Sequence, residues 1–542
     1  MQKNDIFTAV MDGVTSEGHG VCRHEGRAVF VPGALVGEEW EVRVVKCAAN
    51  AVWGRGERRL SASPERVVPR CAAAGRCGGC TLQHMSYAAE LAFKKQRVND
   101  AFRRIGGLDF AIEEILGAPE DARQRCKAIF NVGLSREGKP MAGFYRPRSH
   151  EIVSAPDCTL VRPEALRAAE AVLAWMEAVD FPVHDELKNK QGLRHIFVRS
   201  SRATGKAVVT LISSRNIDDA APLKERLHTA VPEMSGLVWC LNRQKGNVVL
   251  AGDFRTLWGS DTLTETLCGI PFELSPRSFF QVNPPQAEKL YEAAVAYALE
   301  KDPELVMDLY CGTGTIGLCM AKGGARRVIG VEVIAAAVEN ARANAGRLGF
   351  ENTEFLCADA AEAAAELARR GERPGAVVVD PPRKGLDSAV IDSVAGMCPE
   401  RVVYVSCDPG TLARDLALFV KHGYAPQKGL AVDMFPRTPH VETVCLLSKL
   451  NTKQHIEINL DMDELDLTDA EKKATYQEIK DYVLEHSGLK VSSLYVAQVK
   501  QQCGIIEREN YNKPKSEDAK QPQCPPDKEK AIKEALKHFG MI

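Results

Sequence analysis

The sequence predicts a multidomain α/β protein whose largest part is a doubly wound, Rossmann-like domain. From about Ser275 onwards, short runs rich in β-branched residues alternate with Ala-rich helical segments, which is the pattern of a parallel sheet covered by helices on both faces. The chain has 542 residues, too many for one compact core. The segments before and after this domain follow different patterns, so we expect four domains in all.

Residues 1–62 predict a small N-terminal β-barrel, because short β-like runs alternate with glycine-containing turns. Within this segment, GRAVFVPGALVGEEWEVRVV predicts two strands joined by a Pro-Gly turn. Small barrels include RNA-binding modules and purely structural ones, and the sequence of this segment leaves both roles open.

Residues 63–270 predict a central α+β domain that begins with a cysteine-rich loop. An amphipathic helix is expected over 87–105, and its lysines and arginines are expected to form a mostly solvated face. A second helix-like segment, PEALRAAEAVLAWMEAV, interrupts a series of strand-like runs. These runs predict a largely antiparallel sheet built from AIFNVGLS, HIFVRSS, AVVTLISS, GLVWCLN and NVVLAGD.

Residues 271–450 predict the doubly wound domain, and residues 451–542 predict a short helical appendage. The strands expected in the former are LVMDLY, RVIGVEV, TEFLCAD, AVVVDPP, RVVYVSC and VETVCLL. In the appendage, Thr468 and Glu471 form a capping box ahead of the first of three amphipathic helices. Those helices suit either a helix-turn-helix-like module that touches nucleic acid or a small packing appendage, and no function is assigned to them.

Composition indicates a globular protein without a membrane span, since the sequence contains no uninterrupted apolar run of about 18 residues. The N-terminal sequence MQKNDIFTAVMDGV lacks the features of a secretory signal, so we expect a cytoplasmic protein with reduced cysteines. The chain has 17 cysteines, enough to suggest that some of them bind a metal. A net charge of −2 excludes a global electrostatic argument for a nucleic-acid partner, so any RNA-binding surface is expected to be a local patch.

The segment VMDLYCGTGTIGL, residues 306–318, predicts a cofactor-binding loop between a strand and a helix. Asp308 precedes Gly312 and Gly314, an arrangement more typical of the loop that receives the methionine end of S-adenosylmethionine than of a dinucleotide-binding loop. Glu332 ends the next strand, where a carboxylate is expected to bridge two ribose hydroxyls. Asp359 follows the third strand and suits the adenine amino group.

Three side chains at strand ends, Asp380, Cys407 and Glu442, indicate which reaction the domain is expected to catalyse. Asp380 ends AVVVDPP at the mouth of the sheet, where ligands bind in such folds, although two prolines could also mark a simple tight turn. Arg383 follows Asp-Pro-Pro, where enzymes that methylate exocyclic amines often have an aromatic residue, so amine methylation is disfavoured. Cys407 ends the next predicted strand, and Glu442 begins the last one.

A cysteine and a carboxylate placed in this way suit methylation of carbon 5 of a pyrimidine. A thiolate that adds to carbon 6 makes carbon 5 nucleophilic, and a base must later remove the hydrogen from carbon 5. Cys407 is the predicted nucleophile and Glu442 the predicted base. An isolated cysteine at a strand end is more often structural, but the presence of both residues beside Asp380 favours function.

Cys71, Cys77, Cys80 and Cys158 predict a metal site, since four thiolates can bind zinc or an iron–sulfur cluster. Zinc sites usually have two C-x2-C pairs, whereas this set has one pair and two single cysteines, which favours a cluster. The alternative is four unrelated reduced cysteines, and it applies most readily to Cys158.

The ordered set of motifs resembles the RNA uracil-5-methyltransferase family, in the branch that modifies 23S ribosomal RNA. The resemblance covers residues 1 to about 450 and rests on CGGC, GFYRPRSHEIV, SFFQVNPPQ, DLYCGTG, DPPRKG, VSCDP and HVETV. It implies an N-terminal TRAM domain that binds RNA, and a helix near 87–105 that packs against the catalytic domain. It also implies a four-iron four-sulfur (4Fe-4S) cluster on the four cysteines, Cys407 as nucleophile and Glu442 as base, and contacts to S-adenosylmethionine from Gln281, Tyr310, Glu332 and Asp380.

We therefore expect a monomeric methyltransferase that acts on carbon 5 of a uridine in a single-stranded or loop segment of ribosomal RNA. The region around Arg146 and Arg148 is expected to grip the flanking RNA. A transfer-RNA uridine and a cytosine carbon 5 are the alternative targets. An alternative of another class is a non-catalytic RNA-binding iron–sulfur protein, which would not bind S-adenosylmethionine.

Overall fold

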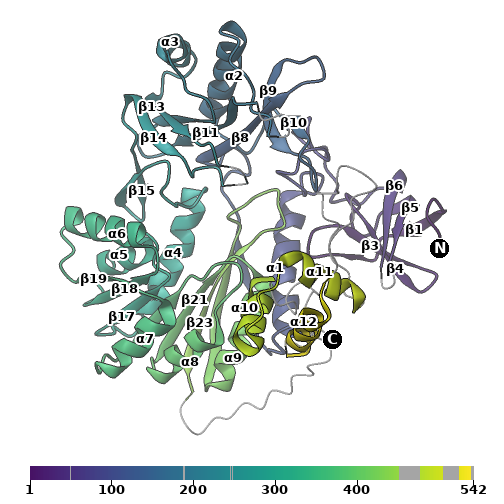
Figure 1. Cartoon of the computed structure of the whole chain (residues 1–542). Coiled ribbons are helices and arrows are strands. Elements are labelled where there is room, and N and C mark those ends of the chain that lie inside the picture. The colour runs from purple at the N-terminus through teal and green to yellow at the C-terminus, as the bar shows by residue number, and fades with distance from the viewer. Residues whose placement is uncertain are drawn as a thin grey trace. The chain divides into compact units, whose positions relative to one another are not determined.

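The computed structural model describes residues 1–48, 51–186, 190–244, 246, 248–450, 476–503 and 524–538 (Figure 1). The chain divides into two compact units, residues 1–458 and 459–542. Within the described residues, every helix is too short or too polar to cross a membrane.

The N-terminal segment forms a six-stranded sheet, with strand order β1-β5-β6-β4-β3-β2. Its core is made of alternating valines, among them Val29, Val42 and Val52, as a one-sided sheet requires. Both strands predicted in residues 26–45 are present, but each pairs with β6 and not with the other. The strands are β1 (Ile6–Val10), β2 (Gly13–Val14), β3 (Gly20–His24), β4 (Arg27–Val31), β5 (Glu39–Cys47) and β6 (Val52–Ser61).

The central region contains a seven-stranded sheet, order β10-β9-β8-β11-β12-β13-β14, in which only the β12–β13 pair is parallel. This agrees with the predicted, largely antiparallel α+β region. Its elements are β8 (Lys127–Leu134), β9 (Pro140–Tyr145), β10 (Ile152–Ser154), α2 (Pro163–Ala178), β11 (Leu193–Ser200), β12 (Ala207–Ser213), α3 (Ala221–Ala230), β13 (Met234–Leu241) and β14 (Asp253–Gly259).

The strand predicted for NVVLAGD is wrong, because residues 248–252 form a loop and the strand begins at Asp253. The side-chain amide of Asn242 donates to the carbonyl oxygens of Val248 and Val249, at 2.8 and 3.0 Å, which takes these groups out of any strand ladder. Val248 is 68% exposed, so its apolar side chain is not part of a core. The apolar run therefore misled the prediction.

The third region is an eight-stranded sheet, order β19-β18-β17-β20-β21-β23-β22-β7, preceded by a separate β15–β16 hairpin. Strands β17 to β21 are parallel, β23 is antiparallel to its neighbours β21 and β22, and this matches the predicted doubly wound domain. The strands are β15 (Leu263–Leu267), β16 (Ile270–Leu274), β17 (Val306–Leu309), β18 (Val328–Glu332), β19 (Thr353–Cys357), β20 (Ala376–Val379), β21 (Arg401–Ser406), β22 (Tyr424–Val432) and β23 (Glu442–Lys449).

Helices cover both faces of this sheet and bury two separate cores. One face is covered by α4, α5 and α6, and the other by α7, α8 and α9. The helices are α4 (Pro284–Leu299), α5 (Thr315–Lys322), α6 (Ala335–Leu348), α7 (Ala360–Arg369), α8 (Ser388–Gly396) and α9 (Pro409–Lys421).

Two elements from before the central region complete the layers of the eight-stranded sheet. Helix α1 (Tyr87–Arg104) places Val98 and Phe102 in the same core as Tyr404 of β21. Strand β7 (Glu114–Leu116), which the sequence analysis did not predict, pairs in parallel with β22. The layers of the eight-stranded sheet therefore include residues 87–116, although these residues precede the central sheet in the sequence.

The prediction of a solvated basic face on α1 is wrong for the part of the helix that faces the sheet. Lys94 is 0% exposed, whereas Arg103 and Arg104 near the helix end are exposed. Counting charges along the helix could not reveal this, because the buried lysine is neutralised by carboxylates, one of which is far away in the sequence.

The described part of the C-terminal unit consists of three helices, as predicted: α10 (Tyr476–Ser487), α11 (Ser493–Gln502) and α12 (Pro526–His538). They share a small apolar core that includes Ile479, Val496 and Ile532. The predicted capping box of Thr468 and Glu471 lies outside the described residues.

Candidate active site

The carboxyl ends of the parallel strands meet at one edge of the catalytic sheet, which is where open α/β sheets bind ligands. Asp380 follows β20 there, and Cys407 follows β21. Strand β23 runs antiparallel to β21, with Ser406 opposite Thr443, so its first residue, Glu442, lies at the same edge. Because β21 and β23 run in opposite directions, Cys407 after the end of β21 and Glu442 at the start of β23 lie at the same edge, although they are far apart in the sequence.

The ionisable groups at this edge influence one another. Burial raises the pKa of the Cys407 thiol to about 11, and the charges of Glu442 and Asp380 add to the increase. Burial also raises the pKa of Glu442 to about 8, with Asp380 as the second cause. The pKa of Asp380 is raised to about 7 by burial. Carboxyl groups with pKa values near neutrality can take and release protons at physiological pH.

Arg383 is the cation of this edge, and the sequence analysis assigned it no role in proton chemistry. Its charge lowers the pKa of Cys407 and of Glu442, against the effect of burial. It thereby favours a thiolate and a carboxylate at these two positions. Its place directly after Asp-Pro-Pro was the available signal, because that segment leaves the sheet at the same edge.

The glycine loop has the backbone that a closely approached ligand requires. Tyr310, Gly312 and Gly314 all have positive φ, at 65°, 55° and 79°. A Cβ at Gly314 would lie 3.0 Å from the side chains of Ala341 and Phe355, so packing excludes other residues there. A Cβ at Gly312 would meet no atom within 4 Å. The open side of the loop is therefore at Gly312, where a ligand can approach the backbone.

Asp308 fixes the glycine loop from its buried side. It is fully buried, and its Oδ2 accepts a hydrogen bond of 2.8 Å from the backbone N–H of Gly317, while its Oδ1 has no partner among the described residues. Burial raises the pKa of Asp308 to about 8, and the charge of Asp380 is the second cause. This carboxyl group therefore fixes the start of α5.

The other residues expected to contact the cofactor lie around the same loop. Glu332 accepts hydrogen bonds from the N–H of Gly312 at 3.1 Å and from that of Ile334 at 2.9 Å. Asp359 is exposed and caps α7, since its Oδ1 accepts from Ala361 and Glu362. One oxygen of Asp359 is thus occupied by the helix, which leaves the other for a ligand.

Gln281 is linked to the helix that follows the glycine loop through the hydroxyl of Tyr291. The buried Tyr291 hydroxyl is hydrogen-bonded to Gln281 and Thr315 and feels the charge of Asp380, and burial raises its pKa. Tyr291 was not singled out from the sequence, because an aromatic residue inside an amphipathic helix resembles ordinary core.

The four predicted metal-binding cysteines line one cavity of about 260 Å³. The same cavity is lined by Arg125, whose Nε is buried and has no hydrogen-bond partner among the described residues. Burial lowers the pKa of Arg125, and the charges that oppose this come from Cys80, Cys158 and Cys77. A buried cation whose neighbouring opposite charges come from thiols fits an anionic group bound by thiolates.

Burial raises the pKa of Cys80 to about 12 and also raises the pKa of Cys77, so these two thiols are protonated in the absence of a ligand. In the described part of the chain, no three histidine, cysteine or acidic residues are arranged to hold a single metal ion. A cavity lined by four cysteines fits a larger, multinuclear group better than one ion.

The chain matches known families along most of its length. The model described as tRNA (Uracil-5-)-methyltransferase matches residues 86–450, and that of the TRAM domain matches residues 4–55. An uncharacterized RNA methyltransferase of Clostridium tetani is 39% identical over 458 residues, 84% of this chain and 98% of the relative. One from Halalkalibacterium halodurans is 38% identical over 453 residues, 83% of this chain and 98% of the relative.

A solved structure has the same fold over most of the chain. It is the Pyrococcus abyssi tRNA (uracil-54, C5)-methyltransferase in complex with S-adenosyl-L-homocysteine, with a TM-score of 0.66 and 27% sequence identity. The likeness covers 81% of this chain and 100% of the other. The residues after about 450 lie outside the matched family model.

Proposed function

The chain belongs to the RNA uracil-5-methyltransferase family, and on this premise we propose that it methylates carbon 5 of a uridine in 23S ribosomal RNA. The observation that carries the proposal is the antiparallel pairing of β21 with β23, which brings Cys407, Glu442 and Asp380 to one edge of the sheet. S-adenosylmethionine supplies the methyl group.

In the proposed reaction, the Sγ of Cys407 forms a bond to carbon 6 of the uracil, and the electron pair of the 5,6 double bond moves towards carbon 5 and O4. Carbon 5 then accepts the methyl group, and the cofactor sulfur that loses it keeps the electron pair of the broken bond and leaves as the thioether of S-adenosylhomocysteine. Arg383 assists by favouring the thiolate, which burial otherwise disfavours. In the last step the sulfur leaves carbon 6 as a thiolate, and the charge of Arg383 favours this form against the effect of burial.

Glu442 is the proposed base. It takes the hydrogen from carbon 5 as a proton, the C–H electrons restore the double bond, and the Cys407 sulfur leaves carbon 6. A pKa of about 8 makes the carboxylate of Glu442 a stronger base than an ordinary glutamate. After each cycle the proton returns to solvent.

We further propose that Tyr310, Gly312, Gly314, Glu332 and Asp359 hold the cofactor, with Gln281 and Asp380 at its methyl end. The positive φ and open side at Gly312 support this, as does the carboxylate of Glu332 bonded beside it. The free oxygen of Asp359 supports a contact to the adenine.

The four cysteines are proposed to bind a four-iron four-sulfur cluster. Their shared cavity and the unpartnered Nε of Arg125 support an anionic group of this kind. The cluster, when bound, would supply a rigid link between the loop of residues 71–80 and Cys158, and its redox chemistry has no part in the proposed reaction.

The preference for ribosomal RNA rests on the resemblance of the ordered motifs to the 23S branch, together with the TRAM domain. A transfer-RNA uridine is the second candidate, since the similar solved structure is of a tRNA-modifying protein. We propose that the protein acts in the cytoplasm, as a monomer, on a uridine that is turned out of its stack.

Mapping of 5-methyluridine in both RNAs, from cells with and without the gene, tests the proposal. We expect the loss of 5-methyluridine from 23S ribosomal RNA alone. Loss from transfer RNA would shift the substrate to the second candidate. Loss of 5-methylcytidine with 5-methyluridine unchanged would replace the target base, and an absence of S-adenosylmethionine binding would indicate a non-catalytic protein.

A further inference from the structure

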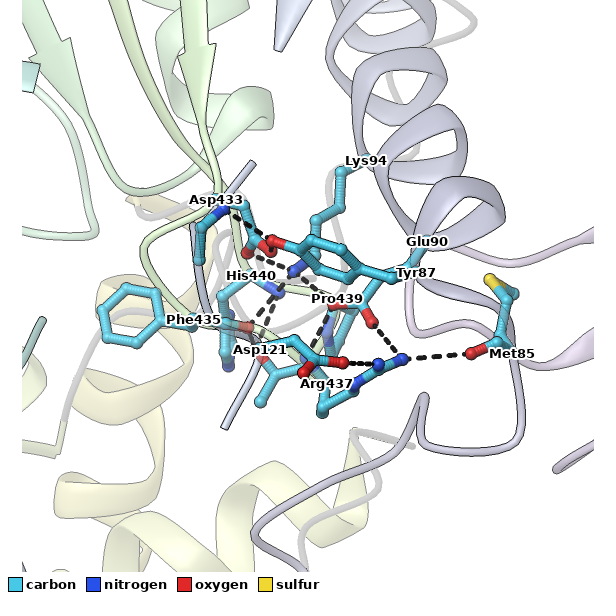
Figure 2. Close-up of polar contacts among 12 residues, drawn as sticks. Met85, Tyr87, Glu90, Lys94, Asp121, Asp433, Phe435, Arg437, Pro439 and His440 are labelled. Atoms are coloured by element: carbon cyan, nitrogen blue, oxygen red, sulfur yellow. Dashed lines mark hydrogen bonds and ion pairs between the residues drawn. The ribbon is translucent and has the colours of Figure 1, made fainter. Parts of the chain in front are cut away.

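One face of helix α1 binds the loop that precedes Glu442. This loop, residues 433–441, links β22 to β23 and is called the Glu442 loop below. The side chains that bind it are Tyr87, Glu90, Lys94 and Arg97, spaced three, four and three residues apart. That spacing places them on one stripe of a helix. Figure 2 shows α1 beside this loop, with the polar contacts between them.

The start of the loop is held by Lys94 and Tyr87. The Nζ of Lys94 donates to Asp433 at 2.6 Å, to Glu90 at 2.8 Å and to the carbonyl of Phe435 at 3.2 Å. The hydroxyl of Tyr87 donates to Asp433 at 2.6 Å. Lys94, Glu90 and Asp433 are fully buried. Breaking one of these contacts would leave a buried charge unpaired, so the loop has little freedom here.

The middle of the loop is held at Arg437. Its backbone N–H donates to Glu90 at 2.7 Å, and its guanidinium donates to the carbonyl of Met85 at 3.1 Å and to Asp121. The carbonyl oxygen of Arg437 accepts from the N–H groups of Thr81 and Leu82, at 3.0 and 3.1 Å. These two residues directly follow Cys80, so the cysteine-rich loop contacts the Glu442 loop through its backbone.

The end of the loop is held by Arg97. Its Nη1 donates to the carbonyl of Pro439 at 2.8 Å, three residues before Glu442. Its Nη2 lies 3.9 Å from the carboxylate of Asp408, which directly follows Cys407. Asp408 is itself fixed, because its Oδ1 caps α9 by accepting from Gly410 and Thr411. One guanidinium thus joins the segment of the proposed base to that of the proposed nucleophile.

In the part of the chain that the structure describes, the Glu442 side chain is not held by hydrogen bonds. Among the described residues, none donates a hydrogen bond to its carboxylate, and its environment acts on it through burial and the charges of Asp380 and Arg383. The position of this carboxylate is therefore set by its backbone, which means by the Glu442 loop and by strand β23.

We propose that Arg97 is a positioning residue that fixes the Glu442 loop against the Cys407 segment, so that the Glu442 carboxylate lies where it can take the proton from carbon 5. The inference rests on the proposed function, because it assigns Arg97 to one step of that reaction. An apolar side chain could pack α1 on the sheet equally well, but it could neither donate to the carbonyl of Pro439 nor pair with the carboxylate of Asp408.

The chemistry allows this step to be isolated with 5-fluorouridine. The Cys407 sulfur can add to carbon 6 of the fluorinated base, and carbon 5 can accept the methyl group. Carbon 5 then carries fluorine in place of the hydrogen that a base removes as a proton. Fluorine would have to leave as F⁺, which no base can achieve, so the protein stays bonded to the RNA. Formation of this adduct needs the sulfur of Cys407 but does not need proton removal by Glu442. A residue that acts through Glu442 should therefore affect turnover and leave the adduct with fluorinated RNA unchanged.

The test compares the full-length protein with its Arg97→Met and Arg97→Lys variants, using Arg104→Met as a control on the exposed end of the same helix. The substrate is total RNA from cells lacking the gene, and the product is 5-methyluridine measured by mass spectrometry. The adduct is measured by denaturing gel on RNA from the same cells grown with 5-fluorouracil.

For Arg97→Met we expect kcat to fall about 10- to 100-fold, since a shift of about 1 Å can cost 10²-fold. KM should fall as well, because the slowed step comes after the adduct has formed. The adduct with fluorinated RNA should form at the rate of the unchanged protein, and an adduct with ordinary RNA should accumulate. Arg97→Lys should recover part of kcat because it keeps one charged donor. The Arg104→Met variant should keep its kcat.

Three outcomes separate the explanations. If the unchanged protein makes no 5-methyluridine, the proposed function fails. If it is active and both Arg97 variants match it, the positioning role is wrong. If the rate of adduct formation on fluorinated RNA falls as much as turnover, Arg97 acts on the Cys407 step or on folding, and the inference is overturned. Arg97→Lys keeps the inference testable if Arg97→Met does not fold.

Discussion

The edge of the catalytic sheet and the cysteine cavity both bury charge that other side chains do not fully neutralise. The buried charge is negative at the sheet edge and positive in the cavity. At the sheet edge, Asp380 and Glu442 are two acids with one partly opposing cation, Arg383. In the cavity, Arg125 is a buried cation that faces thiols and no carboxylate. Because an unpaired buried charge is costly, each place is suited to a group that the chain itself does not provide.

The sign of the buried charge indicates which kind of bound molecule suits the sheet edge and which suits the cavity. Two acids with raised pKa values can exchange protons with a substrate near neutral pH, which suits acid–base chemistry. A permanent cation among thiols cannot exchange protons and instead stabilises bound anions. The network between α1 and the Glu442 loop is a third case, in which most charges are paired within the chain and their role is geometric.

The largest effect is expected from Cys407→Ala, which removes the proposed nucleophile. Methylation should fall by about 10³-fold or more, because the bond to carbon 6 is the step that activates carbon 5. Binding of S-adenosylmethionine, measured by titration calorimetry, should stay within about twofold. Measurable turnover by this variant would contradict the covalent mechanism.

A smaller loss is expected from Glu442→Gln, since the base acts in only one step. The rate of 5-methyluridine formation should fall by about 10²-fold. The protein–RNA adduct should accumulate, because the thiol cannot leave before the proton does. A denaturing gel of the reaction detects it, and its absence would mean that another group takes the proton.

The pH dependence tests whether the buried acids set the rate. A carboxyl group with a raised pKa is protonated, and inactive as a base, below that pKa, so kcat should rise with pH and change slope near pH 8, the pKa of Glu442. Asp380, with a pKa of about 7, titrates together with it and broadens the change. Rates measured from pH 6 to 9 should lose this break in Glu442→Gln. A profile that is flat over this range would contradict the assignment.

The smallest effect on activity is expected at the cysteine cavity. Cys80→Ser should remove most of the iron and acid-labile sulfide, about four of each per chain in the unchanged protein, and lower Tm by about 5 °C. Cys47→Ser is the control, since Cys47 is exposed and far from the cavity in sequence. Activity should fall only several-fold, through the link from Leu82 to Arg437. Full iron content in Cys80→Ser would exclude this thiol as a ligand.

A substitution of the cavity cation sharpens the comparison further. Arg125→Met keeps the four thiols and removes the charge that opposes their protonation. We expect a lower iron content than in the unchanged protein and faster loss of iron to a chelator, followed by visible absorbance. Unchanged iron retention would mean that the cation has another role.

Much of the fold was predictable, because its signals are local. Six strands of the catalytic sheet and helix α1 are where periodicity predicted them, and the cofactor loop has the positive φ that its glycines suggested. Strands β22 and β7 were missed. β22 contains Pro426 and Gly429, which are unusual in strands, and β7 has three residues, too few for a period of two to be visible.

The sequence by itself determined which residue types stand at the ends of strands: Asp380, Cys407 and Glu442, together with the four cysteines. That information is local, because it depends on the neighbours of each residue in the chain. Only the tertiary structure decided that β23 reverses direction beside β21 and that α1 returns to the sheet with Lys94 buried and Arg97 between two segments. These are long-range pairings of backbone and charge, and a single sequence carries no period or spacing that reports them.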